Sequence, residues 1–254
     1  MAYIAPLILM HLFYIWAILR DDLSVVDIFW SLGFWVMSLT AYFMLERPSF
    51  FQTVLLVMVS LWALRLAGYL AWRLLGHGKE DKRYTEMRKN WSGSLALNAY
   101  LRVYLLQFVL QCVISVPLYF YFQSSQEFVL ASNHFGGLFL FLYGFTFQAW
   151  ADFGLAKFKS NPDNKGKIYT QGAWKYSQHP NYFGEASMWI GFFVFTMNVS
   201  PWWTVIGPIT IITFLLKVSG IPLLKREEKY SSNSDYQEYK EKTSLFVPWF
   251  PEEN

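Results

Sequence analysis

Seven stretches of this chain are apolar for long enough to cross a lipid bilayer, and this pattern constrains the fold most. A membrane-spanning helix needs about 20 mostly apolar residues. The pattern predicts an all-α integral membrane protein, a bundle of seven transmembrane helices. The predicted helices lie at about residues 2–19, 26–45, 50–75, 97–122, 135–155, 182–198 and 201–222.

The composition agrees with a membrane protein of several helices. Of the 254 residues, 54% are hydrophobic and only 15% are charged, values that are wrong for a soluble domain of this size. No linker, low-complexity tract or clear internal repeat divides the chain. We therefore expect a single domain over residues 1–254.

The basic residues predict the orientation in the membrane. If the N-terminus faces out, sixteen Lys and Arg residues fall in the inside segments, at position 20 and within 79–89, 157–175 and 225–242. Only Arg47 falls outside. Because short cytoplasmic loops carry an excess of Lys and Arg, this bias predicts an outside N-terminus and a cytoplasmic C-terminus. The first stretch lacks a basic leading region and is expected to be a retained helix.

Several classes of site are excluded by the residue types. Cys112 is the only cysteine, so no intramolecular disulfide and no cysteine metal cluster can form. The four histidines lack metal-ligand spacing, so no metal is expected. The net charge of +3 comes without an aromatic-basic module, which argues against a nucleic-acid partner.

Polar residues inside the apolar stretches are costly and indicate function. Arg65, Tyr69 and Arg73 recur every four residues, so they share one face of the third helix, where they could bind an anion or pair with a carboxylate. Snorkelling is the alternative, and it suits Arg73 better than Arg65. Gln148 and Asp152 also share a face, which predicts a polar pocket near the inner end of the fifth helix.

Two charged features lie near the inner ends of the helices. Asp27 begins the second helix, where an aspartate also suits the helix dipole. The segment from Gly76 to Tyr84 is dense in charge and is either a solvated face or a set of phosphate contacts.

The richest chemistry lies in residues 172–185, which end directly at the sixth apolar stretch. Pro180 or Tyr182 can open that helix, with Asn181 as its cap. A helix N-terminus offers free N–H groups and a positive dipole end to an anion. Glu185 would fall near the first turn, where a carboxylate can bind a carboxamide or move a proton.

Neither a GxGxxG turn after a strand nor a Walker loop is present, so a Rossmann domain is not expected. A nucleotide would have to lie among the inner ends of the helices. The mixed-charge tail from Lys225 is expected to be helical to about Lys242. Its apolar end, residues 245–251, is expected at the membrane interface.

These motifs resemble the steroid 5-alpha-reductase-like membrane family, in particular its uncharacterised bacterial and protist branch. The resemblance covers nearly the whole chain. It is carried by Val26-Asp27-x-x-Trp30, the segment 78–84, Asn164-Lys165-Gly166-Lys167, His179-Pro180-Asn181-Tyr182-Phe183-Gly184-Glu185 and Thr243-x-x-Phe246-Val247-Pro248-Trp249.

The resemblance implies a bundle that binds NADPH from the cytoplasmic side and reduces a carbon–carbon double bond of a membrane-soluble lipid. The cofactor half would be about residues 148–254. Arg65 and Arg73 would contact the phosphates. The other implied cofactor-binding residues are Gln148, Asp152, Lys159, Asn164, Lys165, Tyr176, His179, Asn181, Tyr182, Glu185 and Tyr239.

This chain departs from the steroid-reducing members of the family. Their glutamine-glutamate pair on the second helix is missing, and Trp62 stands where they have a tyrosine. The proton donor is therefore expected to be Glu185, Tyr69 or Tyr84, with Asp27 as the orienting group.

An alternative is a membrane methyltransferase that uses S-adenosylmethionine, since isoprenylcysteine and phospholipid methyltransferases have a similar His-Pro-x-Tyr-x-Gly turn. The Asn181-to-Glu185 continuation and the seven stretches favour the reductase. A transporter or lipid-binding scaffold is less well supported, because the polar residues gather on one side. A bacterial inner membrane or the endoplasmic reticulum is the expected location, with the active site toward the cytoplasm.

Overall fold

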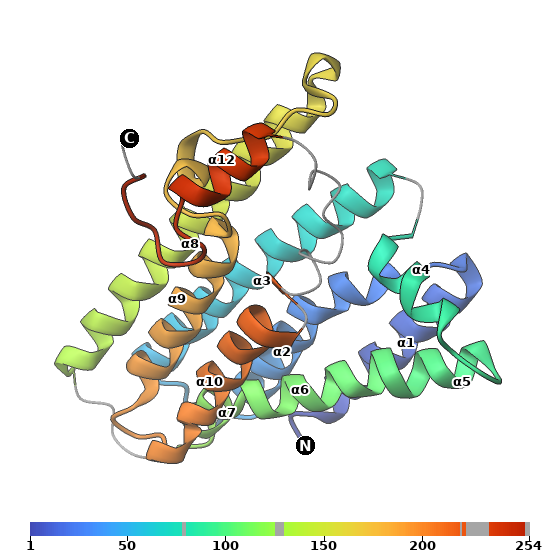
Figure 1. Ribbon diagram of the computed structural model, residues 1–254. Helices are drawn as coiled ribbons and strands as arrows, with labels where there is room; N and C mark the ends of the chain where they lie inside the picture. The colour runs from blue at the N-terminus through green and yellow to red at the C-terminus, as the bar shows by residue number, and fades with distance from the viewer. Residues whose placement is uncertain (78–79, 125–129, 219, 222–233, 252–254) are drawn as a thin grey trace. The chain divides into compact units, whose positions relative to one another are not determined.

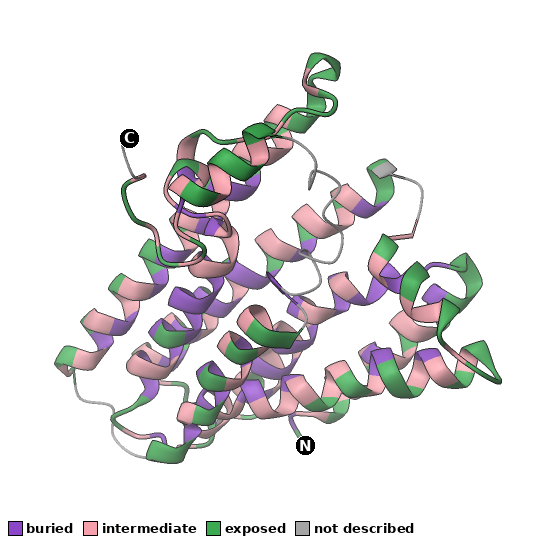
Figure 2. Ribbon diagram, viewed as in Figure 1, coloured by how far each residue is buried: buried purple, intermediate pink, exposed green. Residues whose placement is uncertain are grey.

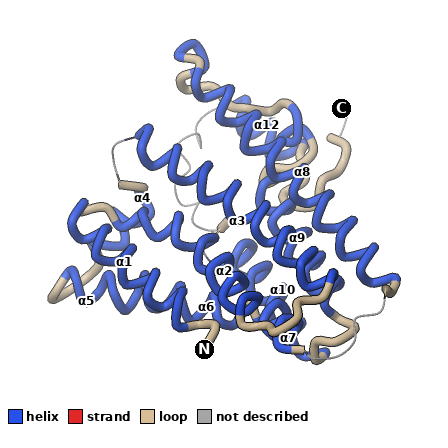
Figure 3. The backbone as a smooth tube through the Cα atoms, turned by 180° about the vertical axis from the view of Figure 1, so that it is seen from behind, coloured by secondary structure: helices blue, strands red, loops and turns tan. Residues whose placement is uncertain are grey.

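The computed structural model describes residues 1–77, 80–124, 130–218, 220–221 and 234–251. Helices and connecting loops make up this described part, and no strand occurs in it (Figures 1 and 3). The residues group into two compact units. Unit 1 comprises Met1–Ala131 with Thr196–Gly207, and unit 2 comprises Ser132–Phe195 with Pro208–Asn254.

Helices occupy all seven apolar ranges. Four helical stretches are long and apolar enough to cross a membrane: Leu23–Phe43, Phe50–Gly76, Leu95–Ile114 and Ser132–Ser160. Two shorter apolar helices, Ile4–Arg20 and Trp202–Val218, lie in the first and last ranges. The sixth range holds α9 (Pro180–Thr196), which has 17 residues.

Unit 1 holds the first seven helices. They are α1 (Ile4–Arg20), α2 (Val26–Phe43), α3 (Phe50–His77), α4 (Lys82–Lys89), α5 (Leu95–Ala99), α6 (Leu106–Ile114) and α7 (Val116–Gln123). Exposed and buried residues are interspersed along the helices (Figure 2). Ile8, Leu12 and Leu19 on α1 are exposed apolar residues. In a membrane protein such side chains face lipid rather than water.

The core of unit 1 is aromatic. Phe34 on α2 meets Trp62 on α3 edge to face, with ring centroids 5.6 Å apart, and both side chains are fully buried. Trp35 also donates its indole N–H to Ser60 Oγ over 3.0 Å. Aromatic pairs of this geometry add to the stabilisation that burial gives, so they hold α2 against α3.

The apolar range 97–122 was predicted as one segment, but it is interrupted. A π-helical stretch, Tyr100–Leu105, joins α5 to α6, and Ser115 separates α6 from α7. Pro117 stands in the first turn of α7. A proline has no backbone N–H and clashes with the preceding turn, which explains why the helix breaks here.

Unit 2 contains α8 (Ser132–Ser160), α9 and α12 (Ser234–Lys242), and α10 (Ile206–Thr213) passes from unit 1 into unit 2. Glycines bring the backbones of α8 and α9 together. A Cβ on Gly144 would lie 2.5 Å from the carbonyl oxygen of Gly184, and one on Gly137 would lie 2.4 Å from the backbone nitrogen of Phe195. Small residues commonly allow such close approach between membrane helices.

The start of α9 decides between the two predicted helix starts and corrects the predicted cap. The helix begins at Pro180, one of the two positions expected. Because the first N–H groups of a helix have no partner within it, the missing N–H of proline loses no helical hydrogen bond there. Asn181 was predicted as the cap, and this was wrong. Asn181 is the second helical residue, and its Oδ1 accepts from the backbone N–H of Tyr182 over 3.0 Å.

The tail is helical over Ser234–Lys242, as predicted for that part. The rest of the predicted tail helix, residues 225–233, lies outside the described residues. Beyond α12 the chain is irregular, with bends at Thr243 and at residues 245–247, and Trp249 and Phe250 are largely exposed.

Candidate functional site

The centre of unit 2 is a buried carboxylate on α9. Glu185 is 5% exposed, and both of its oxygens accept hydrogen bonds. Gln148 on α8 donates its amide to Oε2 over 2.8 Å, and Trp189 donates its indole N–H to Oε1 over 3.0 Å. Both neighbours are donors, so both oxygens of the Glu185 carboxyl group act as acceptors.

Gln148, one of the polar pair predicted on α8, lies at this same place. Gln148 and Asp152 are one turn apart, and both are buried. The Gln148 amide also reaches the backbone oxygen of Asn181 at 3.4 Å. The side chains of Gln148 and Glu185, predicted separately, are therefore in direct contact.

The turn before α9 brings two aromatic rings together. The rings of His179 and Tyr182 stack, with centroids 5.7 Å apart and an interplanar angle of 12°. The backbone N–H of His179 donates to Ser177 Oγ over 3.1 Å, which fixes the turn just ahead of Pro180.

The turn is held by residues 234–251, which we call the C-terminal strap. Tyr239 on α12 donates its hydroxyl to the backbone oxygens of Trp174, at 2.7 Å, and Ser177, at 3.2 Å. Gln178 donates its amide to the carbonyl oxygens of Lys240, at 3.0 Å, and Thr243, at 2.7 Å. Burial raises the pKa of the Tyr239 phenol, with a smaller effect from Tyr236.

Main-chain bonds continue this attachment beyond α12. Gln178 N–H donates to the oxygen of Ser244 over 2.8 Å, and Trp249 N–H donates to that of Tyr176 over 2.9 Å. The ring of Phe246 packs edge to face on Phe183, at 5.7 Å. The strap therefore fixes residues 174–183, where four of the predicted cofactor-binding residues lie.

The lysine loop after α8 is a compact turn. Asn164 donates its amide to the carbonyl oxygen of Phe158 over 2.9 Å and so terminates the helix. Gly166 has a φ of 85°, a value that favours glycine. Lys159 and Lys165 are exposed. An open hollow of about 320 Å³ is lined by Gly166, Lys167, Ile168, Thr170 and Asp235.

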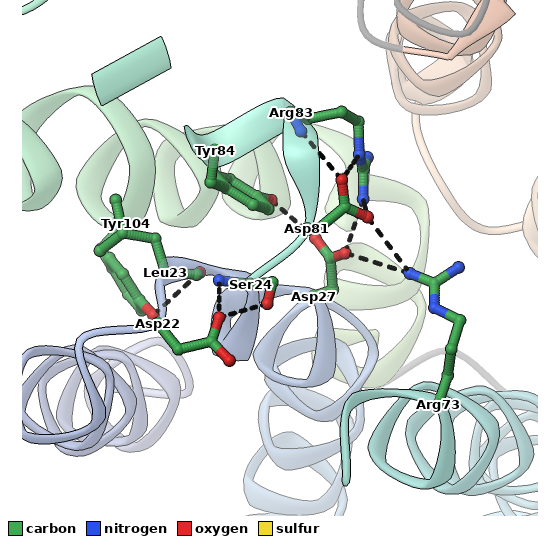
Figure 4. A network of polar contacts seen from close by, with 9 residues as sticks. All are labelled: Asp22, Leu23, Ser24, Asp27, Arg73, Asp81, Arg83, Tyr84 and Tyr104. Atoms are coloured by element: carbon green, nitrogen blue, oxygen red, sulfur yellow. Dashed lines mark hydrogen bonds and ion pairs between the residues drawn. The ribbon is translucent and has the colours of Figure 1, made fainter. Parts of the chain in front are cut away.

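Unit 1 holds a second cluster, centred on Asp27 (Figure 4). Tyr84 donates its hydroxyl to Asp27 Oδ1 over 2.7 Å, and Arg83 Nη2 donates to Oδ2 over 2.8 Å. Arg73 Nη2 lies 3.6 Å from the same oxygen and 3.9 Å from Asp81 Oδ2. Asp27 therefore accepts a hydrogen bond from a phenol and is also an ion-pair partner of Arg83 and Arg73.

The N-terminus of α4 supplies the rest of this cluster. Asp81 caps α4 by accepting from the backbone N–H of Arg83 over 3.0 Å, and it also accepts from the guanidinium. Burial raises the pKa of Asp81, but the hydrogen bonds and charge of Arg83 and the charge of Arg73 outweigh it, so the pKa is lowered.

Burial, followed by the charge of Asp27, raises the pKa of Tyr84 well above its ordinary value. The charge of Asp27 is the main reason why the pKa of Arg83 is raised. The phenol and the guanidinium therefore both keep their protons at neutral pH.

The remaining predicted residues are on α3. Arg65, Tyr69 and Arg73 are half-buried and share one face, as the four-residue spacing predicted. The Tyr69 ring lies 6.2 Å from that of Trp72. Arg65 and Tyr69 belong to unit 1, together with the Asp27 cluster. Their roles toward a cofactor or a substrate stay predictions.

Sequence reasoning missed four contributing residues. Trp189 stands four residues after Glu185, and that helical spacing could have revealed it. Asp81 and Arg83 were seen only as part of a charged run, although an aspartate just before a helix is a common cap. Gln178 carried no signal, because its partners are backbone oxygens about 60 residues further along the chain.

Residues 13–243 match the family described as "Protein of unknown function (DUF1295)". The chain belongs to the DUF1295 family. No curated protein and no solved structure matches it. The DUF1295 match includes the Asp27 cluster, Glu185 with its two donors, and the strap as far as Thr243.

Proposed function

We propose that this DUF1295 protein is an NADPH-dependent reductase of a carbon–carbon double bond in a membrane-soluble lipid. The observation that carries the proposal is the buried Glu185 carboxylate, held by Gln148 and Trp189 at the start of α9. An ionisable group inside an apolar helix is costly unless it is used. The resemblance of this segment to steroid 5-alpha-reductase-like enzymes supports the same reading.

The residue chemistry of unit 2 fits a phosphorylated dinucleotide. Lys159, Lys165, Lys167 and Lys175 are exposed cations suited to phosphate groups. A carboxylate oxygen can accept more than one hydrogen bond, so Glu185 suits the N–H groups of a carboxamide. The sulfonium of S-adenosylmethionine is a cation and gains nothing from the lysines, so this set favours NADPH over the methyltransferase alternative.

NADPH would supply the hydride when bound. The chain would bind and orient the cofactor and the lipid, and it would supply the proton to the lipid. Gln148 and Trp189 fix the Glu185 carboxylate, so its position is set before any ligand arrives. Asp27 holds the Tyr84 hydroxyl, as expected of an orienting carboxylate beside a proton donor. The proton donor is proposed to be Glu185, Tyr69 or Tyr84.

We further propose seven membrane spans, with the N-terminus outside and the active site toward the cytoplasm of a bacterial inner membrane or the endoplasmic reticulum. The bias of basic residues supports this orientation. A reporter fused after Arg47 is expected to be active only outside, and one fused after Lys89 only inside. The opposite pattern would reverse the proposed orientation.

Calorimetric titration of the purified full chain with NADPH and with S-adenosylmethionine tests the function. Binding of NADPH alone is expected. Arg65→Ala and Asn181→Ala should weaken NADPH binding about tenfold or more, because each removes one charged or buried hydrogen-bonding contact. Arg47→Ala and Asn90→Ala, at exposed positions, are matched controls. Tight binding of S-adenosylmethionine without NADPH binding would favour the methyltransferase instead.

A further inference from the structure

The strap exposes apolar side chains beyond α12 that the proposed reductase chemistry does not use. Four residues there have exposed fractions between 41% and 74%: Leu245, Val247, Trp249 and Phe250. We call these four residues the outer face of the strap. A cluster of exposed, large apolar side chains commonly marks a contact surface, so the outer face needs a partner other than water.

The exposed residues change from polar to apolar where α12 ends. On α12 they are Ser234, Asp235, Gln237, Glu238 and Glu241. Thr243 is buried, and every exposed residue from there to residue 250 belongs to the outer face. Such a change is expected where a chain passes from water into the interface of a bilayer, in which tryptophan is enriched. The composition of residues 245–251 predicted this position, and the structure identifies the side chains that are exposed there.

The inner side of the same segment is bonded to the turn before α9. The hydroxyl of Ser177 donates to the backbone oxygen of Phe246 over 2.9 Å. Trp249 takes part through its backbone N–H, which donates to the oxygen of Tyr176 over 2.9 Å. Within the described residues, the side chain of Trp249 makes no hydrogen bond or ring contact. The outer face therefore remains available while the inner side holds the turn.

Aromatic contacts lead from the strap to α8, a helix long and apolar enough to cross a membrane. Phe246 meets Phe183 with ring centroids 5.7 Å apart, and Phe183 meets Phe147 on α8 at 5.8 Å. Phe147 lies between exposed apolar residues that recur every three or four positions and so share one side of α8. They are Phe135, Phe139, Leu142, Tyr143, Trp150 and Phe153.

A lipid bilayer fits both surfaces at once. The exposed side of α8 is apolar along the helix, as expected of a surface that faces lipid, and the strap contacts this helix through Phe183. Lys175 is exposed and lies 5.9 Å from the ring of Tyr176, where a long cationic side chain can reach lipid headgroups. We propose that the outer face of the strap docks on the bilayer interface beside α8, and that the docked strap keeps residues 174–178 in place. The proposal rests on the proposed membrane spans and not on the reductase chemistry.

A spin label on the outer face tests this contact. The full-length protein would be placed in lipid nanodiscs with Cys112, its only cysteine, replaced by alanine and a label attached at Val247→Cys. Collisions of the label with oxygen, which concentrates in lipid, and with a water-soluble nickel chelate are measured. Phe139→Cys, on the exposed side of α8, is the reference for lipid. Glu241→Cys, exposed on α12, is the reference for water.

The label at position 247 should behave like the label at 139. It should collide with the nickel chelate about tenfold less often than the label at 241, because burial of one large apolar side chain favours the docked strap by about that factor. Trp249→Ser should return the label to water. It should also quicken amide hydrogen exchange in residues 174–178 about tenfold, although the backbone N–H that donates to Tyr176 is kept. Glu241→Ser should change neither result.

Three results would overturn the proposal. Collisions at 247 that match those at 241 would place the outer face in water. A label at 247 that neither reagent reaches would mean that protein covers the outer face. Unchanged exchange in Trp249→Ser would show that the turn does not depend on the docked strap. If the label at 139 also collides freely with the nickel chelate, the proposed span of α8 fails as well, so the two failures can be told apart.

Discussion

Trp189 and Glu185 lie one turn apart on α9, and the indole N–H of Trp189 donates to Glu185 Oε1 over 3.0 Å. The amide of Gln148, on α8, donates to the other oxygen. Helix α9 thus carries a carboxylate whose position is set by one neighbour on its own helix and one on the adjacent helix. From this arrangement we predict separate effects of substitutions on protein stability and on NADPH binding.

Glu185→Gln is expected to destabilise the protein by about 1–3 kcal/mol, because the new amide places a donor against the Gln148 donor. The double variant Gln148→Glu with Glu185→Gln should recover much of this loss. It again pairs a donor with an acceptor between the helices, and the amide oxygen introduced on α9 can still accept from Trp189. Thermal unfolding in detergent is the measurement.

NADPH binding should not recover in the double variant, because the carboxylate then stands on α8 instead of α9. If the exchange restores both stability and binding, Glu185 has no role specific to its position.

Gly137→Ala is expected to destabilise unit 2 by about 1–3 kcal/mol, the usual cost of overpacking. The added methyl group would meet the backbone of Phe195 and force α8 away from α9. Gly136→Ala is the control, because its Cβ would meet only Val194 Cγ1, at an ordinary 3.7 Å. Thermal unfolding should show little change for the control. Equal losses in the two variants would argue against close backbone packing.

Tyr239→Phe should loosen the attachment of the strap to residues 174–177. The variant removes the one hydroxyl proton that the oxygens of Trp174 and Ser177 share, a loss of about 1 kcal/mol. Amide hydrogen exchange in residues 174–178 should therefore quicken about fivefold or more. Ser234→Ala, at an exposed position on the same helix, should leave the exchange unchanged.

Acid should weaken the attachment of α4. The folded pKa of Asp81 lies below the ordinary aspartate value of 3.8, so its stabilising contribution is present above about pH 4. It is lost as the pH falls through the folded pKa. Asp81→Asn should lower stability at neutral pH and flatten the decline below about pH 4. An unchanged acid limb in Asp81→Asn would assign the acid sensitivity to other groups.

Alkali should act through Tyr84. Because its folded pKa is raised above 10, its contribution is fully present below about pH 10 and is lost as the pH rises further. Tyr84→Phe should flatten this alkaline limb, at the cost of a donor to Asp27. Unfolding followed between about pH 8 and 11 would check the slope. A slope equal to that of the unmodified protein would exclude Tyr84 as its source.

Much of the helical framework could be predicted, because apolar length is a local property of the sequence. The spacing of Gln148 and Asp152 and the position of Pro180 likewise gave the right face and the right helix start. The break at Ser115 was missed, although Pro117 marks it, because the apolar pattern runs through it without interruption.

The contacts between distant segments could not be predicted. The Gln148–Glu185 bond depends on how closely α8 approaches α9, and this is set by glycines that look unremarkable in sequence. The helical face of Arg73 predicted an anion or a carboxylate as its partner, and the assignment to phosphates came from the family resemblance. The sequence did not show that Asp27 and Asp81 lie beside it. The hydrogen bonds of the strap are accepted by backbone oxygens, which every residue has. No residue type in the sequence therefore indicates where the strap binds.

The strap also sets an order of events during synthesis. Tyr239 follows Trp174 by 65 residues. A ribosome adding about 5–20 residues per second makes this partner about 3–13 s later. The loop ahead of α9, and α9 itself, therefore emerge before the loop's hydrogen-bonding partners exist. A chain that ends before residue 239 should keep α8 and α9 and yet lack the hydrogen bonds that hold residues 174–178.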